Sequence, residues 1–197
     1  MEEELGELLS KRERLVLNGE LLKHSAVLVP LLTINETYHI LFVRRSKEVE
    51  HHKGEISFPG GVCEKGDNSF EGTALREAFE EIGIQPRDVV ILGRVDDMET
   101  VSTRYRVTPV VGVIPYPYSF TLSAKEVDEI LTVPVSQLLQ SGNGKEESIL
   151  REGKRYTSYV YRYKNYLIWG ATARILKNFL ALWETVRSLD DTGNSLL

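Results

Sequence analysis

The stretch from Gly60 to Ile84 constrains the fold of this 197-residue chain more than any other. Two adjacent glycines follow Pro59, a pattern typical of backbone that turns sharply or approaches a ligand closely. Residues 73–81 contain neither glycine nor proline and consist mostly of good helix formers, so they predict a helix. Asp, Asn or Ser at 67–69 can cap its start, and Gly83 stands where a left-handed residue often ends a helix.

The predicted helix has an apolar face and an acidic face. The apolar stripe at helical spacing consists of Leu75, Ala78, Phe79 and Ile82. Glu77, Glu80 and Glu81 follow at i, i+3 and i+4, so we expect their carboxylates to share the opposite face. Like charges at this spacing destabilise a helix by roughly 0.2–0.5 kcal/mol per pair. A divalent cation removes the conflict because it prefers carboxylate oxygens and bridges to phosphates, whereas the alternative is a solvated acidic face.

This stretch resembles the Nudix box, the signature of the Nudix hydrolase superfamily. The box is a glycine, five residues, a glutamate, seven residues, and then Arg-Glu-apolar-any-Glu-Glu-any-Gly-apolar. Gly61 matches its first position, and residues 76–84 match every specified place of its second half. The middle departs from the pattern, because Asp67 stands for the glutamate and eight residues rather than seven separate it from Arg76. The resemblance implies an α/β fold, specifically an α/β/α sandwich with a mixed β-sheet.

The resemblance also implies a metal-dependent hydrolysis of a diphosphate and roles for individual residues. The expected ligands of Mg²⁺ or Mn²⁺ are Glu77, Glu80, Glu81 and the carbonyl oxygen of Gly61. The metal would neutralise the diphosphate and make a bound water more acidic, while Arg76 would orient the carboxylates. The proton of that water would pass to one of these glutamates or to Glu126 or Glu129. Those last two residues could equally lie on a solvated helix or turn.

The segment before the glycines is rich in basic residues. Residues 44–53 contain four of them and two histidines, a composition suited to gathering phosphate, although a solvated polar loop is the alternative. The residues expected to bind the substrate are Arg45, Ser46, Lys53, Gly60 and Gly61.

Part of this segment resembles a second signature, found upstream of the box in the coenzyme A pyrophosphatase branch of the Nudix family. That signature runs Leu-Leu-Thr-any-Arg-Ser, three residues, Arg, three residues, Gly, three residues, Phe-Pro-Gly-Gly. The matching residues are Leu41, Arg45, Ser46, Gly54, Phe58, Pro59, Gly60 and Gly61. Three positions depart: Phe42 stands for Leu, Val43 for Thr, and Glu50 for the second Arg.

The branch implies cleavage of the diphosphate linkage in coenzyme A or its derivatives, giving (acyl-)phosphopantetheine and adenosine 3′,5′-bisphosphate. Glu50 bears on this substrate, because replacing a phosphate-contacting arginine removes a charge-assisted hydrogen bond worth roughly 1.5–3 kcal/mol. One alternative is another nucleoside diphosphate derivative, such as ADP-ribose, a nucleotide sugar or a dinucleoside polyphosphate. Another is a non-catalytic nucleotide-binding Nudix domain, which the three clustered glutamates disfavour.

The composition excludes several classes of protein. A net charge of -5 offers no basic surface for nucleic acid or an anionic membrane, and no apolar run reaches membrane-spanning length. Cys63 is the only cysteine, so no intrachain disulfide can form, and we interpret it as a small loop residue rather than a catalytic thiol. The acidic start Met1-Glu2-Glu3-Glu4 is unlike a signal or transit peptide. We therefore expect a cytoplasmic protein.

The length indicates one domain with short flanking segments. We expect an N-terminal helical arm over residues 1–22, a Nudix hydrolase domain over 23–189 and a flexible tail over 190–197. In the arm, the spacing of the leucines predicts a helix over residues 3–22 that breaks at Asn18-Gly19. The arm either packs on the domain or contributes to a homodimer, and the sequence leaves both open.

Strand patterns occupy residues 25–34, 38–45, 89–95 and 107–114. Pro30 and Pro109 fall inside two of these strands, which predicts an edge position or a bulge for each. An aromatic-rich hairpin pattern over residues 148–163 precedes a helix over 170–189. The hairpin tyrosines either pack in half-buried strands or stack on a base.

Overall fold

The computed structural model covers residues 1–197 and describes all of them except 18–21, 50–51, 101–104, 152 and 194–197. The elements in chain order are α1 (Glu2–Lys11), β1 (Lys23–Ile34), β2 (Thr37–Arg45), β3 (Ile56–Ser57), β4 (Gly60–Val62), α2 (Phe70–Ile82), a 3₁₀ turn (Pro86–Asp88), β5 (Val90–Arg94), β6 (Met98–Glu99), β7 (Tyr105–Val113), β8 (Val127–Pro134), α3 (Val135–Leu138), β9 (Lys145–Arg151), β10 (Lys154–Tyr163), β11 (Tyr166–Ile168) and α4 (Gly170–Gly193). No helix of the described part is both long and apolar enough to cross a membrane.

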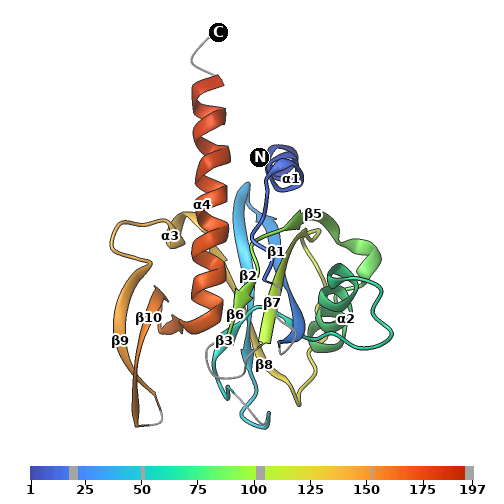
Figure 1. Ribbon diagram of the computed structural model, residues 1–197, viewed down its shortest axis with the longest axis vertical. Helices are drawn as coiled ribbons and strands as arrows, with labels where there is room; N and C mark the ends of the chain where they lie inside the picture. The colour runs from blue at the N-terminus through green and yellow to red at the C-terminus, as the bar shows by residue number, and fades with distance from the viewer. Residues whose placement is uncertain (18–21, 50–51, 101–104, 152, 194–197) are drawn as a thin grey trace.

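The main sheet is mixed and lies between two layers of helix (Figure 1). Its central path is β3-β2-β1-β7-β5, in which β1 and β7 run parallel and their other pairings are antiparallel. Alternate residues of β1 point to opposite faces, so Leu28 and Leu32 pack towards α2 while Val29 and Leu31 pack towards α4. The predicted α/β fold with a mixed sheet is confirmed.

The two strand prolines lie in interior strands, so the predicted edge positions are wrong. The side of β1 that carries the Pro30 nitrogen pairs with β4 up to Val27 and with β2 only from Leu31. Likewise β7 pairs with β6 up to Val107 and with β5 only from Val110, and Pro109 lies between them. Each proline therefore stands where its strand changes partner, so its missing N–H removes no ladder hydrogen bond.

The N-terminal helix is shorter than predicted, because α1 ends at Lys11, and the expected break at Asn18-Gly19 lies outside the described residues. Residues 12–17 leave the helix to pair with the loop after β5, where Arg12 and the Leu15 amide both donate to the Asp96 carboxylate. Leu5 and Leu9 of α1 are buried against β5 and α4. The arm therefore packs on its own domain, and the homodimer stays a prediction.

Helix α2 begins and ends where the sequence predicts, with the Ser69 hydroxyl accepting from the Gly72 amide and Gly83 left-handed at φ 76°. Its buried face is not the predicted stripe. Phe79 is 46% exposed, whereas Glu81 is buried beside Ala78 and Ile82. Glu81 lies three residues after Ala78 and seven after Ala74, on the same side of the helix, so the sheet covers a carboxylate instead of a phenyl ring.

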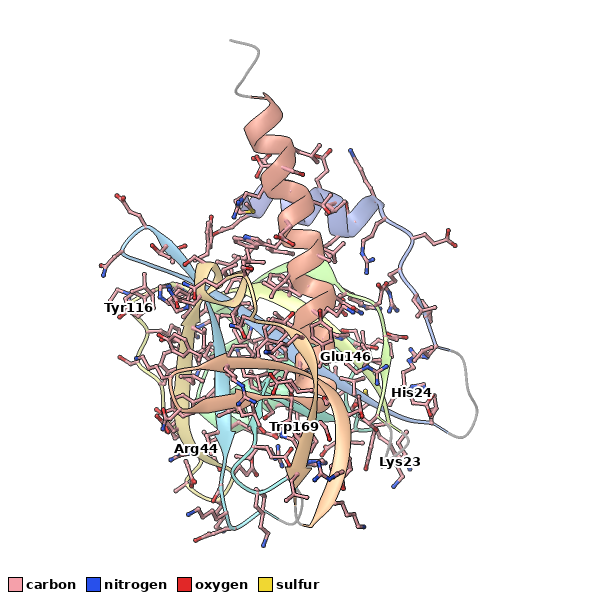
Figure 2. All side chains as sticks on the ribbon, turned by 90° about the vertical axis from the view of Figure 1, so that its left-hand side faces the viewer. Lys23, His24, Arg44, Tyr116, Glu146 and Trp169 are labelled. Carbon is pink, nitrogen blue, oxygen red and sulfur yellow. The ribbon has the colours of Figure 1, made fainter. Side chains whose placement is uncertain are left out.

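A second, three-stranded sheet of order β11-β10-β9 confirms the predicted hairpin and lies on the α4 side of the main sheet (Figure 2). Tyr161 points into the core beneath it, and Tyr156 lies 5.7 Å from Trp169 between ring centroids. Strand packing therefore accounts for these two tyrosines. Helix α4 continues to Gly193, four residues beyond the expected boundary at 189.

Asp97 is the buried anchor of the N-terminal arm, and its removal should destabilise the fold. Its carboxylate accepts from Arg14 Nη1 at 2.7 Å and Thr108 Oγ1 at 2.8 Å, and it faces Arg106 Nε at 3.1 Å. Asp97→Ala leaves the buried Arg106 without its carboxylate, so we expect a loss of about 3–5 kcal/mol in urea unfolding. The partly exposed Asp96 serves as the matched control, and equal losses for Asp96→Ala and Asp97→Ala would contradict the anchor.

Candidate active site

The two glycines of β4 lie in close contact with helix α2, which carries the three glutamates. Strand β4 pairs with β1, which sets Gly60 and Gly61 beside the last turns of α2. A Cβ at Gly61 would lie 2.4 Å from Glu77 Oε1, so only glycine leaves room for that carboxylate. Gly60 has φ 157° and a Cβ there would lie 2.4 Å from the Ala26 carbonyl oxygen. At Gly60 the clash is with backbone, so glycine is required there, whereas a side chain at Gly61 would displace the Glu77 carboxylate.

Arg76 joins the loop to the helix through Asp67. Its Nε and Nη2 each donate to one oxygen of the Asp67 carboxylate at 3.1 Å, and Nη2 also donates to the Val62 carbonyl oxygen at 2.9 Å. Asp67 further accepts from the Thr73 hydroxyl at 2.8 Å. The bidentate hydrogen bond from Arg76 holds the pKa of Asp67 far below its usual range. Sequence reasoning noted Asp67 only as a cap candidate and a departure from the box, and missed this role.

Arg76 also holds two of the three glutamates that are expected metal ligands. Its Nη1 donates to Glu77 Oε1 at 2.9 Å and to Glu80 Oε2 at 3.1 Å. Burial raises the pKa of Glu77, which Arg76 partly opposes and the neighbouring Glu80 and Glu126 reinforce. Glu80, in contrast, has a side chain that is 50% exposed.

Glu81 is the most deeply buried acid of the helix, with 3% of its surface exposed. Its carboxylate accepts from the Gly60 amide at 3.2 Å and lies 3.7 Å from Arg45 Nη1. Burial raises the pKa of Glu81 to about 8 despite the attraction of Arg45, and the negative charges of Glu77 and Glu126 raise it further. The charge of this carboxylate is therefore only partly compensated.

The expected convergence of three carboxylates on one point does not occur. Among the residues that the structure describes, no three His, Cys, Asp or Glu side chains are arranged to hold a metal ion. Arg76 draws Glu77 and Glu80 to itself, whereas Glu81 turns to Arg45 and Gly60. The Arg76 guanidinium on one side and the burial of Glu81 on the other therefore keep the three carboxylates apart.

The donor chemistry nevertheless fits a divalent cation. Glu81 is buried with incomplete charge compensation, and Glu77 sits in a space that glycine alone leaves free. Both carboxylates have a raised pKa, which is the electrostatic cost that a bound cation would relieve. Hard oxygen donors of this kind suit Mg²⁺ or Mn²⁺.

The two glutamates named outside the box lie in different places. Glu126 is close enough to Glu77 and Glu81 for its charge to raise the pKa of both. Glu129 accepts from the Tyr166 hydroxyl and lies 3.1 Å from Arg44 Nη1. Of the two candidates, only Glu126 is placed beside the carboxylates of α2.

The residues expected to bind substrate are placed unequally. Arg45 reaches Glu81, as described, and Lys53 lies exposed in the loop before β3. Ser46 is buried, and its hydroxyl accepts from the Glu48 amide at 3.1 Å, so it shapes this loop instead of facing a ligand. Glu50, the departure from the second signature, lies outside the described residues.

Relatives and solved structures agree with this geometry. The model of the NUDIX domain matches residues 22–152. A protein of Photorhabdus laumondii named "Uncharacterized Nudix hydrolase NudL" is 38% identical over 154 residues, 78% of this chain and 81% of the relative. A protein of the same name from Citrobacter koseri is 36% identical over 172 residues, 86% of this chain and 88% of the relative.

A solved MutT/nudix family protein from Enterococcus faecalis has a similar fold, with a TM-score of 0.55 and 17% identity over 89% of this chain and 66% of that one. The matched family and the NudL relatives show that this chain belongs to the Nudix hydrolase family, as a pyrophosphohydrolase of a nucleoside diphosphate derivative.

Proposed function

We propose that this Nudix hydrolase cleaves the diphosphate linkage of coenzyme A or its derivatives, giving (acyl-)phosphopantetheine and adenosine 3′,5′-bisphosphate. The observation that carries the proposal is the position of two residues of the second signature beside the carboxylate of Glu81. Its Arg45 lies 3.7 Å from Glu81, and its Gly60 donates to the same carboxylate. The part of the sequence that resembles the coenzyme A branch therefore borders the acidic helix.

The chain's own residues divide the work. The proposed metal ligands are Glu77, Glu80, Glu81 and the carbonyl oxygen of Gly61. A bound divalent ion supplies charge neutralisation and a more acidic water. Arg76, fixed by Asp67, orients Glu77 and Glu80. Arg45 at the end of β2, with Lys53 in the loop that follows, holds phosphate oxygens.

The general base is a glutamate of the box or Glu126. Glu129 is withdrawn from this role, because its carboxylate is engaged by Tyr166 and Arg44. A carboxyl group with a pKa raised by burial, such as Glu81, accepts a proton more readily near neutral pH than an exposed one.

Another nucleoside diphosphate derivative is the second candidate, because Glu50 replaces the second arginine of the coenzyme A signature. A purely nucleotide-binding domain is disfavoured, since binding alone does not require buried carboxylates at incomplete charge compensation. We also propose a cytoplasmic location and no nucleic-acid partner, on the single cysteine and the net charge of -5.

Glutamine at either buried glutamate should abolish turnover and preserve the fold. We expect Glu77→Gln and Glu81→Gln each to lower kcat at least about a hundredfold, because each removes an anionic oxygen donor or a base. Formation of adenosine 3′,5′-bisphosphate from coenzyme A with saturating Mg²⁺ or Mn²⁺ measures this loss, and far-UV circular dichroism checks the fold. Glu129→Gln is the matched control and should keep kcat within about threefold of the parent value. Near-normal turnover in both box variants would refute the metal cluster.

In chelator-treated protein, the burial of the Glu81 carboxylate should lower the free energy of unfolding by an amount that depends on pH. Its pKa is about 8 when folded, against about 4.3 in an unfolded chain. Between these values the folded state binds more protons, so the free energy of unfolding falls as pH rises from about 4 to 8. Glu81→Gln removes this cost, so its gain in Tm should be larger at about pH 9 than at about pH 5, by roughly 2–4 °C per kcal/mol. Equal gains at both pH values in scanning fluorimetry would contradict the burial argument.

A product-resolved screen tests the substrate. Coenzyme A, acyl-coenzyme A, ADP-ribose and diadenosine polyphosphates are compared by kcat/KM, and we expect the coenzyme A compounds to lead at least about tenfold. Glu50→Arg restores the signature and should raise coenzyme A turnover about tenfold or more. No improvement would mean that residue 50 does not meet phosphate. No release from any compound would favour the non-catalytic alternative.

A further inference from the structure

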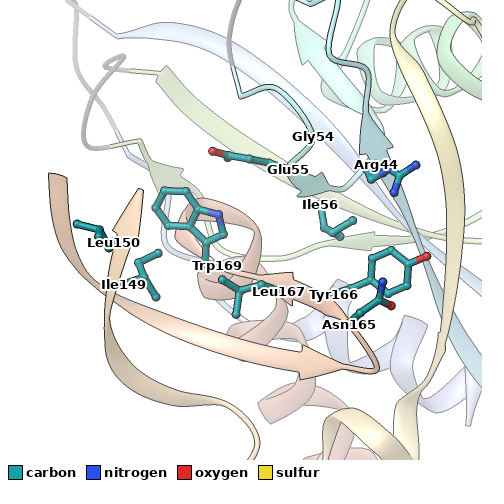
Figure 3. Close-up of a pocket in the computed structure, with 10 residues that line it drawn as sticks. All are labelled: Arg44, Gly54, Glu55, Ile56, Ile149, Leu150, Asn165, Tyr166, Leu167 and Trp169. Atoms are coloured by element: carbon teal, nitrogen blue, oxygen red, sulfur yellow. The ribbon is translucent and has the colours of Figure 1, made fainter. Parts of the chain in front are cut away.

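A cavity of about 300 Å³ lies on the side of the main sheet opposite α2, under the second sheet (Figure 3). We call it the hairpin pocket; it is lined by Arg44, Gly54, Glu55, Ile56, Ile149, Leu150, Asn165, Tyr166, Leu167 and Trp169. Sequence reasoning did not find it, because its walls come from four separate segments. Its volume is at the lower end for small-molecule sites, which suits a part of a ligand rather than a whole nucleotide derivative.

The walls of the hairpin pocket combine apolar side chains with uncharged polar and charged groups, and their polar surface is slightly the larger. In Figure 3, Ile149 and Trp169 lie together at one end of the pocket, and Ile56 lies apart from them, towards Tyr166. Leu150 lines it too, although 68% of that residue is exposed. An exposed leucine beside Ile149 and Trp169 is surface that a ligand's hydrocarbon would remove from water, while the polar groups of the lining can pair with a ligand's amides.

The charges around the pocket do not favour phosphate. Arg44 is the only cation among the described lining residues, and it lies 3.1 Å from Glu129 and 3.9 Å from Asp128. Tyr166 donates its hydroxyl to the same Glu129 carboxylate. The charge of Arg44 is thus matched by carboxylates, in contrast to Arg45 on the other face.

The pocket and the carboxylates lie on the two faces of one sheet edge. Arg44 and Arg45 are adjacent in β2, so their side chains point to opposite faces. Ile56 lines the pocket, and Gly60, four residues later, donates to Glu81. Four residues of extended chain span roughly 14 Å, about the reach of a linear arm of a dozen bonds.

We propose that the hairpin pocket binds the uncharged arm of the substrate, a chain of amides that ends in a thiol or an apolar acyl group. This inference rests on the proposed coenzyme A-type substrate. The diphosphate lies at Arg45 and the glycines, the arm passes around the short edge strand β3, and the acyl tail packs on Trp169 and Leu150. The phosphorylated nucleotide half is excluded from the pocket, because Arg44 is already paired.

Equilibrium binding tests the pocket without catalysis. The chain has two tryptophans, so Trp183→Phe leaves Trp169 as the sole indole reporter. S-octanoylpantetheine, added in the presence of chelator, should shift the Trp169 emission and saturate. Adenosine 3′,5′-bisphosphate at the same concentrations should not. A shift with the bisphosphate alone, or with neither compound, would overturn the assignment.

Kinetics with a matched pair of variants tests the same pocket in the intact enzyme. Leu150→Asp should raise KM for octanoyl-coenzyme A about tenfold with little change in kcat, because it removes a few buried methylenes and adds a charge. ADP-ribose has no such arm, so its kcat/KM should stay unchanged in this variant. Val90→Asp, at a residue 63% exposed on β5, is the control and should alter neither substrate.

The two experiments separate failure of the pocket from failure of the substrate. Hydrolysis of octanoyl-coenzyme A with no effect of Leu150→Asp would overturn the pocket and leave the proposed function standing. Saturable binding of S-octanoylpantetheine without hydrolysis of any coenzyme A compound would refute the proposed substrate but support the pocket's preference for a neutral arm. Equal losses for octanoyl-coenzyme A and ADP-ribose would overturn the pocket.

Discussion

The bidentate pairing of Arg76 with Asp67 fixes the loop between β4 and α2 to the middle of that helix, and the placement of Glu77 and Glu80 depends on it. The same guanidinium then has Nη1 available for Glu77 and Glu80. One arginine thereby pairs with three carboxylates, and its positive charge reduces the repulsion between Glu77 and Glu80 along the helix. Because Asp67 takes two of its donors, the remaining one is aimed at the acidic group, which accounts for an aspartate at this altered spacing.

Glu81 shows the opposite treatment of charge. It is held in the helix face that packs on the sheet, where a hydrophobic residue would stabilise the fold more, and its partners compensate it only in part. A buried carboxylate with incomplete charge compensation does not itself stabilise the fold. Its burial makes sense as a site that is completed by a cation or a proton, so stability is given up where the chemistry needs an unsatisfied oxygen.

Local patterns predicted α2 and its caps, because these depend on residues close together in sequence, whereas the mixed α/β fold was implied by the resemblance to the Nudix box. Local patterns could not extend further, because strand pairing joins residues far apart in sequence. They could not predict which face of α2 is buried, since β4 and the sheet decide that Glu81 rather than Phe79 lies inside. Pro30 and Pro109 looked like edge signals, yet both stand where an interior strand changes partner. Likewise, helical spacing predicted that the side chains of Glu77, Glu80 and Glu81 lie near one another. It could not predict their rotamers, because these are set by contacts with Arg76 and Arg45.

The two faces of the sheet at the end of β2 separate the residues proposed for catalysis from those proposed for substrate recognition. Arg45 and the glycines face the carboxylates, whereas Arg44, one residue earlier, is neutralised on the other face by Glu129. The box lies wholly on the first side, so it can specify cleavage of a diphosphate without specifying what is attached to it. Discrimination among diphosphates must then come from residues outside the box, and the hairpin that carries Leu150 is the part of the chain that encloses a cavity on the second side. This division explains why a sequence can match the box closely and still leave its substrate to the segments around it.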